Sequence, residues 1–120
     1  MREKVLIIDD DSRNTFALSA VLAAKGYVCI CAADMLIAFD LLQTNTDIEI
    51  ILIDMMMPDM DGYEALPMLK ADQRYKQIPV IAVTAQAMKG DKEKCLSAGA
   101  DNYIAKPVNI DALLQMMNQY

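Results

Sequence analysis

The stretches VLIIDD, residues 5–10, and IILID, residues 50–54, indicate the fold of this chain more clearly than any other part of it. Each is a short run of aliphatic residues that ends in aspartate. Runs that are apolar on both faces are typical of buried strands in a parallel sheet. Parallel strands end at one edge of the sheet, which is where open α/β folds bind their ligands. We therefore expect the terminal aspartates to lie close together at that edge.

These aspartates are Asp9, Asp10 and Asp54. Two carboxylates about 4 Å apart repel each other by roughly 4 kcal/mol at an effective dielectric constant of about 20. Such groups would oppose folding unless something positive lay among them. The sequence therefore predicts a positive group at the same edge of the sheet.

Five strand-like runs alternate with five helix-like stretches along the chain. The strands are predicted over residues 4–9, 27–31, 49–53, 79–83 and 102–105, and the helices over residues 13–25, 34–43, 64–71, 87–98 and 110–119. Strict alternation with short connections predicts an α/β fold, a doubly wound parallel sheet with helices on both faces. Because no linker or repeat interrupts this pattern, we interpret residues 1–120 as a single domain.

Two of these helices contain residues that disfavour a helix. Pro67 lacks an N–H and is tolerated only in a first turn, so we expect this helix to start near Glu64 or Ala65, or to bend at Pro67. The fourth helix, residues 87–98, contains Gly90 and has only a thin apolar stripe. We expect it to be weakly held. Asp11 and Ser12 are candidates to cap the first helix.

The composition argues against several classes of function. The chain has 120 residues, a net charge of −6 and no histidine. The acidic balance argues against direct binding to nucleic acid, and no apolar run is long enough to span a membrane. The N-terminus enters a strand rather than a signal peptide, so we expect a cytoplasmic domain that makes no membrane contact. Any chemistry that needs imidazole must be supplied by a partner.

The cysteines Cys29, Cys31 and Cys95 do not make a disulfide framework. Cys29 and Cys31 lie two residues apart in a predicted strand, so they share one face and do not bridge each other readily. Without histidine or a second cysteine pair, the chain lacks the ligands of a tetrahedral metal site. We interpret all three as buried structural thiols in a reducing compartment.

The most specific local pattern is DMMMPDMDG, residues 54–62. It leads from a buried strand through a Met-Pro loop to an Asp-Gly turn before a helix. Alone, it is equally compatible with an ordinary loop and a solvated aspartate. Thr84 and the pair Lys106-Pro107 also lie at predicted strand ends, where each alone is most often a turn or loop residue. Together with the aspartates, these residues indicate a functional site.

The order of these motifs resembles that of response-regulator receiver domains. The matching segments are IDD at 8–10, DMMMPDMDG at 54–62, VTA at 83–85 and YIAKP at 103–107, and the resemblance covers all 120 residues. It implies a flavodoxin-like (βα)5 fold with the five strands in the order 2-1-3-4-5. It also implies a phosphoacceptor signalling domain rather than an enzyme. Such a domain catalyses only its own phosphorylation and dephosphorylation.

The resemblance implies that Asp54 accepts a phosphoryl group from a phosphohistidine. Asp10, Asp54 and the backbone carbonyl of Met56 would ligate Mg²⁺ or Mn²⁺ directly, and Asp9 would act mainly through bound water. Hard oxygen ligands that leave several waters in place are those that Mg²⁺ prefers. The implied metal set is therefore Asp9, Asp10, Asp54 and Met56.

Further roles follow from the same resemblance. Lys106 would add a positive charge beside the phosphoryl oxygens, with a cis peptide bond between Lys106 and Pro107 that determines where it points. Thr84 would donate its hydroxyl to a phosphoryl oxygen and form a switch with Tyr103. The face made by the fourth helix, fifth strand and fifth helix would then change its affinity for partners. Considered by itself, Tyr103 is also compatible with an amphipathic edge aromatic.

Two side chains in the pattern bear on the lifetime of the phosphorylated state. They are Met56 and Gln86, which lie two residues after Asp54 and Thr84 respectively. In receivers these positions admit or exclude the hydrolytic water. Because an apolar methionine cannot orient a water molecule, we hypothesise slow self-dephosphorylation.

The segments at residues 13–19 and 87–95 are most similar to receivers attached to hybrid sensor histidine kinases, in which case the full-length protein would be a histidine kinase. A free-standing response regulator is the alternative. In both contexts the implied partner is a histidine kinase or a histidine phosphotransfer domain. The resemblance is also compatible with a dimer that forms on phosphorylation.

Three other classes of protein compete with this interpretation. A phosphohydrolase of the haloacid-dehalogenase type also uses an aspartyl nucleophile and Mg²⁺, but its Asp-x-Asp-x-Thr pattern is absent after the first strand. A pseudo-receiver would use the same fold without phosphate, and the intact set of acids, threonine and lysine argues against it. A flavodoxin-like cofactor binder is disfavoured because no phosphate-cradling loop follows the first strand.

Overall fold

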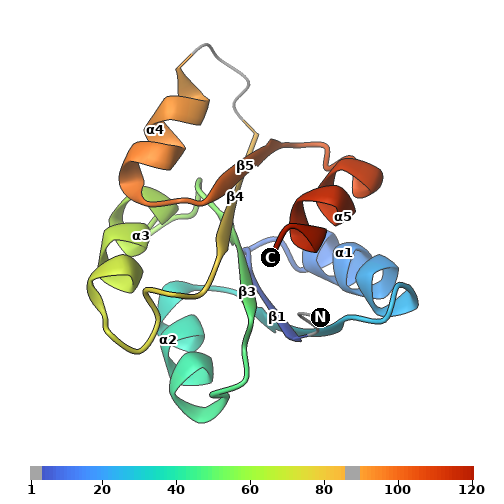
Figure 1. Cartoon of the computed structure of the whole chain (residues 1–120), viewed down its shortest axis with the longest axis horizontal. Helices are drawn as coiled ribbons and strands as arrows, with labels where there is room; N and C mark the ends of the chain where they lie inside the picture. Colours follow the sequence, from blue (N-terminus) through green and yellow to red (C-terminus); the bar gives the residue numbers. More distant parts are fainter. Residues whose placement is uncertain (1–3, 86–89) are drawn as a thin grey trace.

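The computed structural model describes residues 4–85 and 90–120 and contains one five-stranded parallel sheet (Figure 1). The elements are β1 (Lys4–Ile8), α1 (Ser12–Ala24), β2 (Val28–Ala32), α2 (Met35–Thr44), β3 (Ile50–Asp54), α3 (Gly62–Ala71), β4 (Val80–Thr84), α4 (Asp91–Ala98), β5 (Asn102–Ala105) and α5 (Ile110–Asn118). The strand order is β2-β1-β3-β4-β5, and all neighbouring pairs are parallel. The predicted fold class and strand order are confirmed.

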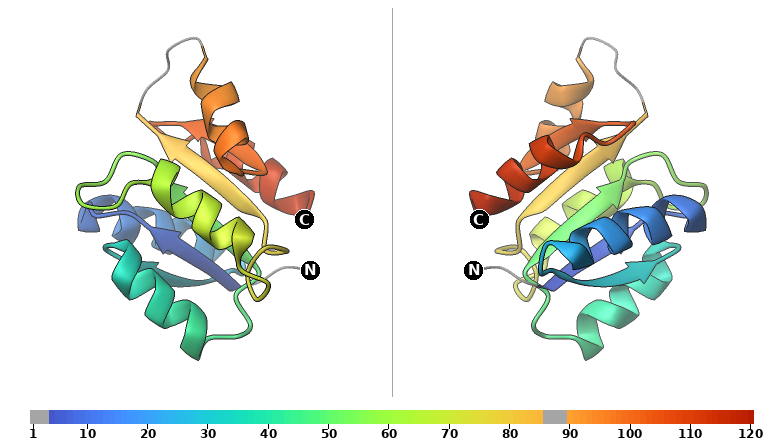
Figure 2. Two further views of the ribbon diagram at one scale, coloured as in Figure 1. Left: turned by 90° about the vertical axis from the view of Figure 1, so that its left-hand side faces the viewer. Right: turned by 90° about the vertical axis from the view of Figure 1, so that its right-hand side faces the viewer.

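Helices cover both faces of the sheet, which explains why its strands are apolar throughout (Figures 1 and 2). On one face, alternate strand residues such as Leu6 and Ile51 pack in a cluster with side chains of α2, α3 and α4. On the other face, the intervening residues, such as Val5 and Leu52, pack with side chains of α1 and α5. The period-two alternation of side chains thus supplies two cores from one set of strands.

The strands β3 and β4 each end one residue later than the sequence predicts. Asp54 pairs in register with Val83, and Thr84 pairs with Ala105. Both polar residues are therefore the last members of a ladder rather than the first members of a loop. The ladder holds their backbones at the edge where the strands end.

The prediction that the third helix starts late, near Glu64 or Ala65, is wrong, because α3 begins at Gly62. The carboxylate of Asp61 accepts the N–H of Glu64 at 3.0 Å and caps the helix there. Pro67 therefore lies in the interior of α3, beyond the first turn. Its side chain is on the exposed side of the helix, where the ring meets solvent rather than a neighbouring element.

Gly62 is required by a close approach of two backbone segments. A Cβ atom at this position would overlap the Sδ atom of Met55 and lie 2.9 Å from its Cα atom. Gly62→Ala is therefore expected to lower the free energy of unfolding by about 1–3 kcal/mol, as measured by urea denaturation. Gly26→Ala is the control, because a Cβ there meets nothing within 4 Å and only the positive φ of 96° opposes it. A smaller loss for Gly62→Ala than for Gly26→Ala would contradict this explanation.

The fourth helix begins later than predicted, at Asp91, and Gly90 is its N-cap rather than an interior residue. Gly90 has a φ of 100°, and among the described residues no side chain caps this helix. Asp91 and Cys95 are the residues of α4 that are buried. The predicted residues 87–89 lie outside the described part of the chain.

Only one of the three cysteines is buried as expected. Cys95 is buried, Cys29 is half-buried and Cys31 is exposed. The interpretation of Cys31 as a buried thiol is wrong because it lies on β2, which is an edge strand of the sheet formed by residues 4–85 and 90–120. Over the described residues, no helix has both the length and the apolarity that crossing a membrane demands.

Candidate functional site

The carboxylates of Asp9, Asp10 and Asp54 lie together at the edge where β1 and β3 end. One oxygen of each lies within 4.8 Å of those of the other two. Asp9 and Asp54 are buried, at 5% exposure each, whereas Asp10 is exposed. The position of these residues at the ends of two neighbouring strands produces the cluster that the sequence predicts.

The positive group at this cluster is Lys106, which directly follows β5. Its Nζ atom lies 3.3 Å from Oδ2 of Asp9 and 3.4 Å from Oδ2 of Asp54. The peptide bond between Lys106 and Pro107 is cis. One lysine therefore bridges two buried carboxylates that come from different strands.

The electrostatics of the cluster follow from its burial. Burial raises the pKa of Asp54 above its ordinary value, and the nearby charge of Asp9 raises it further. The N–H of Met56 and the ammonium group of Lys106 partly offset this rise. Burial by itself lowers the pKa of Lys106, but the charges of Asp54 and Asp9 outweigh it and the pKa is raised. Lys106 is therefore cationic at neutral pH.

Backbone and side-chain donors orient the buried carboxylates. Asp9 accepts the N–H of Asp11 at 2.9 Å and the side-chain amide of Asn14 at 2.7 Å. Asp54 accepts the N–H of Met56 at 3.0 Å. The sequence did not indicate Asn14, although its place in the first turn of a helix that follows Asp10 would have been a signal. Asp11 caps α1 as predicted, accepting from the N–H groups of Arg13 and Asn14.

Thr84 and Tyr103 lie on the face of the sheet that α4 covers. Thr84 is fully buried at the end of β4. Tyr103 of β5 pairs in register with Ala82, which lies two residues before Thr84. Tyr103 is half-buried and packs against the cluster shared by α2, α3 and α4. Burial raises the pKa of its hydroxyl, and the charge of Asp91 adds to this rise.

The methionines after Asp54 differ in their environments. Met55 and Met57 are buried in the core, at 0% and 8% exposure. Met56 is 48% exposed and lies beside the carboxylate cluster. The other residue predicted to affect the lifetime of the phosphorylated state, Gln86, lies outside the described residues.

The carboxylate cluster has the properties of a metal site. Its donors are all oxygen atoms, the set that suits Mg²⁺ or Mn²⁺. Lys106 balances only part of the charge of the three carboxylates, so a divalent cation would relieve the remaining repulsion. The exposure of Asp10 leaves room for the water ligands that Mg²⁺ retains. These residues therefore fit such an ion.

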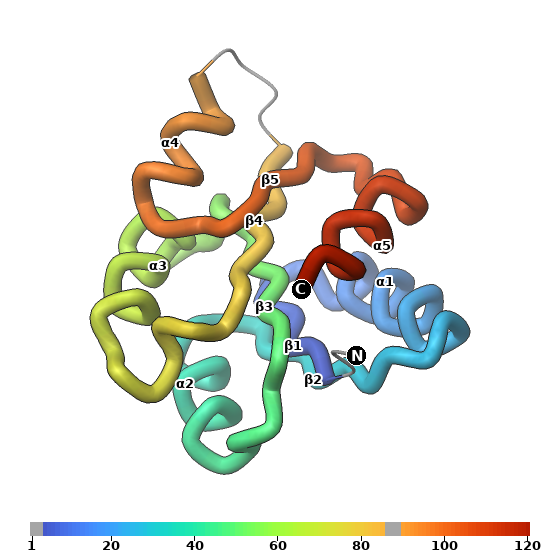
Figure 3. Tube along the Cα trace, viewed as in Figure 1, coloured from blue at the N-terminus to red at the C-terminus, as the bar shows by residue number. Residues whose placement is uncertain are grey.

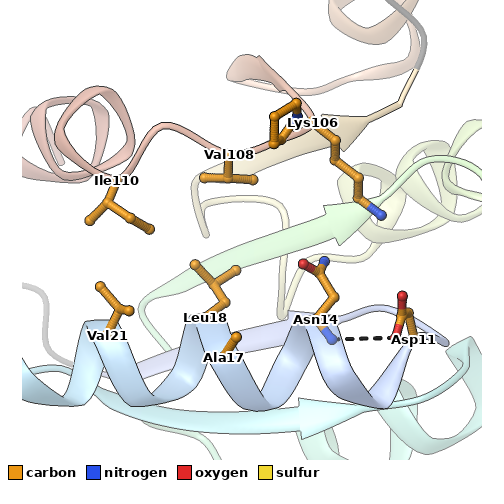
Figure 4. Close-up of a pocket in the computed structure, with 9 residues that line it drawn as sticks. Asp11, Asn14, Ala17, Leu18, Val21, Lys106, Val108 and Ile110 are labelled. Carbon is orange, nitrogen blue, oxygen red and sulfur yellow. Dashed lines mark hydrogen bonds between the residues drawn. The ribbon is translucent and has the colours of Figure 1, made fainter.

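An open groove of about 550 Å³ lies beside the cluster, between α1 and the loop before α5 (Figure 4). Lys106, Asn14 and Asp11 line the end nearest the carboxylates, and apolar side chains line the remainder. Figure 4 shows Leu18 and Val21 of α1 facing Val108 and Ile110 across the groove.

The chain matches the response regulator receiver domain family over residues 5–118. It belongs to this family. The receiver domain is 35% identical over 120 residues to the polar-differentiation response regulator DivK of Brucella ovis, and the match covers 100% of this chain and 97% of DivK. Receiver domains act in two-component signal transduction, which agrees with the resemblance of the sequence motifs.

Solved structures agree with this assignment. The chemotaxis protein CheY4 of Vibrio cholerae superposes with a TM-score of 0.89 and 28% identity, over 99% of this chain and 98% of CheY4. The receiver domain of a sensor histidine kinase from Pseudomonas aeruginosa superposes with a TM-score of 0.87 and 31% identity, over 100% of this chain and 98% of that one. That structure has a magnesium ion coordinated in its active-site cleft.

Proposed function

We propose that this receiver domain accepts a phosphoryl group on Asp54 from a phosphohistidine of a histidine kinase or a histidine phosphotransfer domain. The observation that carries the proposal is the geometry of Asp54. One carboxylate oxygen accepts the N–H of Met56, and the other lies 3.4 Å from the ammonium group of Lys106. An oriented carboxylate beside a fixed positive charge is suited to attack phosphorus and to stabilise the acyl phosphate that forms.

In the proposed transfer, an oxygen of Asp54 forms a P–O bond while the P–N bond of the phosphohistidine breaks. The electron pair of that bond returns to the imidazole of the partner, since this chain has no histidine. Lys106 stabilises the charge on the phosphoryl oxygens, and the hydroxyl of Thr84 donates to one of them. The domain acts on no separate substrate and so is a phosphoacceptor rather than an enzyme in the usual sense.

Asp10, Asp54 and the backbone carbonyl of Met56 would hold Mg²⁺ or Mn²⁺, with Asp9 acting through water. The bound ion supplies positive charge to the transferring phosphoryl group. Asn14 and the N–H of Asp11 keep the carboxylate of Asp9 directed at the site. The magnesium ion in the related receiver from Pseudomonas aeruginosa supports this arrangement.

Chemical mapping tests the identity of the acceptor. The protein is incubated with acetyl phosphate and Mg²⁺, treated with hydroxylamine and digested. An acyl phosphate at Asp54 becomes a hydroxamate, which tandem mass spectrometry locates. A hydroxamate at Asp9 or Asp10 instead would contradict the proposal, and no hydroxamate at all would favour a pseudo-receiver. Steady release of phosphate from an ester substrate would favour the phosphohydrolase class.

The exposed side chain of Met56 supports a long-lived phosphorylated state. It lies next to the acceptor and offers no group that could orient a water molecule. Met56→Asn is therefore expected to speed dephosphorylation about tenfold, which corresponds to about 1.4 kcal/mol of activation free energy. Loss of the phosphorylated species is followed by intact mass, with Met68→Asn, at a similarly exposed methionine on α3, as the control. An unchanged rate for Met56→Asn rules out this role.

The groove beside Lys106 is where we propose that the phosphodonor protein docks. It leads to the carboxylates and is lined by apolar side chains of α1 and of the loop before α5. Ala17→Arg would fill it from the exposed side of α1. We expect at least about tenfold slower transfer from a phosphorylated histidine phosphotransfer domain and an unchanged rate with acetyl phosphate, which does not need the groove. Equal rates of transfer from the protein donor to the wild type and to Ala17→Arg would contradict docking in this groove.

We propose that residues 1–120 form one cytoplasmic receiver domain whose switch is Thr84 and Tyr103. Their common face with α4 supports a transition in which a new bond from Thr84 to phosphate lets Tyr103 move inward and changes the surface of α4, β5 and α5. Tyr103→Trp provides the test, since its fluorescence should change on phosphorylation and stay constant when Thr84→Ala is added.

Two molecular contexts fit this receiver domain, a free-standing regulator and a domain of a hybrid histidine kinase. The match to DivK extends over 97% of that regulator, which favours a free-standing protein. The similarity of residues 13–19 and 87–95 to hybrid-kinase receivers, and the match to a sensor-kinase receiver, favour attachment to a kinase. Immunoblotting of cells with an antibody to this domain distinguishes them, because a free-standing regulator would migrate near 13.3 kDa.

A further inference from the structure

The edge strand β2 lacks the features that usually prevent edge-to-edge association. It reads Val-Cys-Ile-Cys-Ala over residues 28–32 and contains no charge and no proline. Within the described residues, β1 is its only neighbour in the sheet, at the end of the strand order (Figure 3). Natural edge strands are usually blocked by lysine, proline or a bulge. Val28 is 56% exposed at this edge.

The backbone of β2 directs specific groups outward. The carbonyl of Ala32 accepts the N–H of Asp9, which continues the ladder from β1, so Ala32 points its polar groups inward. Because successive residues in a strand alternate, Ile30 and Val28 also point inward. The N–H and C=O groups of Cys29 and Cys31 therefore face away from the sheet, where a further strand would bind them.

Exposed apolar surface extends from the strand to the neighbouring helix. The Sγ atom of Cys31 lies 3.0 Å from Oγ of Ser19, which places this side of α1 next to the edge. Phe16 lies three residues before Ser19, so it is on the same side of α1, and it is 78% exposed. A strand added to β2 would therefore bury apolar side chains as well as satisfy backbone groups.

We propose that β2 pairs with β2 of a second copy of this chain in antiparallel orientation, about a two-fold axis at Ile30. The axis places Cys29 of one copy opposite Cys31 of the other, and these are the residues whose polar groups face outward. Two such pairs, each exchanging two backbone hydrogen bonds, would join two sheets into one. An interface of this kind is isologous and closes at the dimer.

Charge complementarity favours a second copy in this orientation. Lys25, the C-cap of α1, precedes β2, and Asp34, the N-cap of α2, follows it. Antiparallel pairing about Ile30 brings the end of β2 that follows Lys25 in one copy beside the end that precedes Asp34 in the other, on both sides of the axis. Parallel pairing would place like charges together. The dimer thus matches opposite charges although each copy carries a net charge of −6.

Sedimentation velocity over a range of concentrations tests the association. We expect the wild type and Val28→Thr to form dimers reversibly. Val28→Lys, which puts a charge on the edge, should raise the dissociation constant at least about tenfold. Phosphorylation by acetyl phosphate should be unchanged in both variants, which shows that they are folded. A wild type that remains at 13.3 kDa at all concentrations, or a dimer that Val28→Lys leaves intact, would overturn the proposal.

Crosslinking tests the orientation. Lys25→Cys and Ala33→Cys are made separately in a Cys31→Ser background, at two exposed positions that flank β2. Burial is the larger cause that raises the pKa of Cys29, and it remains when Cys31 is replaced, so this thiol competes little near pH 8. Antiparallel pairing predicts that a short bismaleimide joins the two variants when they are mixed, faster than it joins either variant to itself. Faster crosslinking within the separate samples would overturn the antiparallel arrangement.

Discussion

Lys106→Ala is expected to lower the initial rate of phosphorylation by acetyl phosphate about 100-fold. Lys106 is the positive side chain in contact with Asp54, and loss of one group that stabilises transition-state charge costs roughly 2.7–4 kcal/mol. It also bridges Asp54 to Asp9, so its removal leaves two buried carboxylates without their counterion. Without added metal, the free energy of unfolding should fall by about 3 kcal/mol.

The rate is measured by intact-protein mass at early times, and the stability by urea denaturation in the presence of a chelator. Lys4→Ala is the matched control, because Lys4 also pairs with an aspartate, Asp47, whose carboxylate is exposed rather than buried. We expect little change in either quantity for the control. A wild-type rate in Lys106→Ala would show that the ammonium group does not act on the phosphoryl group.

Asp54→Asn is expected to stabilise the metal-free domain at neutral pH while abolishing phosphorylation. The pKa of Asp54 is raised in the folded state, so folding favours its protonated form. The stability that this protonation contributes is fully present below the pKa of Asp54 in the unfolded state, which is about 4. It is lost as the pH rises through the higher pKa of Asp54 in the folded state. Asparagine carries no charge to bury and should lack that part of the pH dependence.

Magnesium should reverse the order of stability. An ion that binds only the folded state adds about 2.7 kcal/mol at a concentration of about 100 times its dissociation constant. We expect this gain in the wild type and a much smaller one in Asp54→Asn, where one carboxylate ligand is missing. Thermal unfolding from pH 4 to 8, with Mg²⁺ and with a chelator, measures both effects. If the thermal stabilities of the wild type and Asp54→Asn changed with pH in parallel, the assigned burial of charge on Asp54 would be contradicted.

The sequence was sufficient to predict the sheet because its strands are buried on both faces. Runs such as residues 5–8 and 50–53 have no polar residue, which leaves few alternatives to a covered parallel sheet. Because strand ends in a parallel sheet coincide, Asp9 and Asp54 are also predictable as neighbours at one edge. Where a predicted strand end differs from the observed one, it differs by a single residue. Apolar content does not distinguish the last paired residue of a strand from the first residue of a loop.

Errors arose where a local contact outweighs intrinsic preference. Pro67 suggested a late start for α3, but the cap from Asp61 starts the helix at Gly62. Cys31 is interpreted as a buried thiol because the chain lacks the partners for a disulfide framework or a tetrahedral metal site, and only the strand order shows that it lies at an edge. Asp59 adopts a positive φ of 62° in the loop before α3, a conformation that the residue type alone does not reveal. Contacts between distant residues, such as that of Asn14 with Asp9, depend on the assembled fold.

The central claim is that Asp54 is a metal-dependent phosphoryl acceptor. Its most direct test is the intact mass of the protein after incubation with acetyl phosphate, with and without Mg²⁺, for the wild type and Asp54→Asn. We expect a single phosphoryl adduct in the wild type that requires Mg²⁺ and is absent from Asp54→Asn. An adduct that persists in Asp54→Asn, or one that forms equally well in the presence of a chelator, would contradict it.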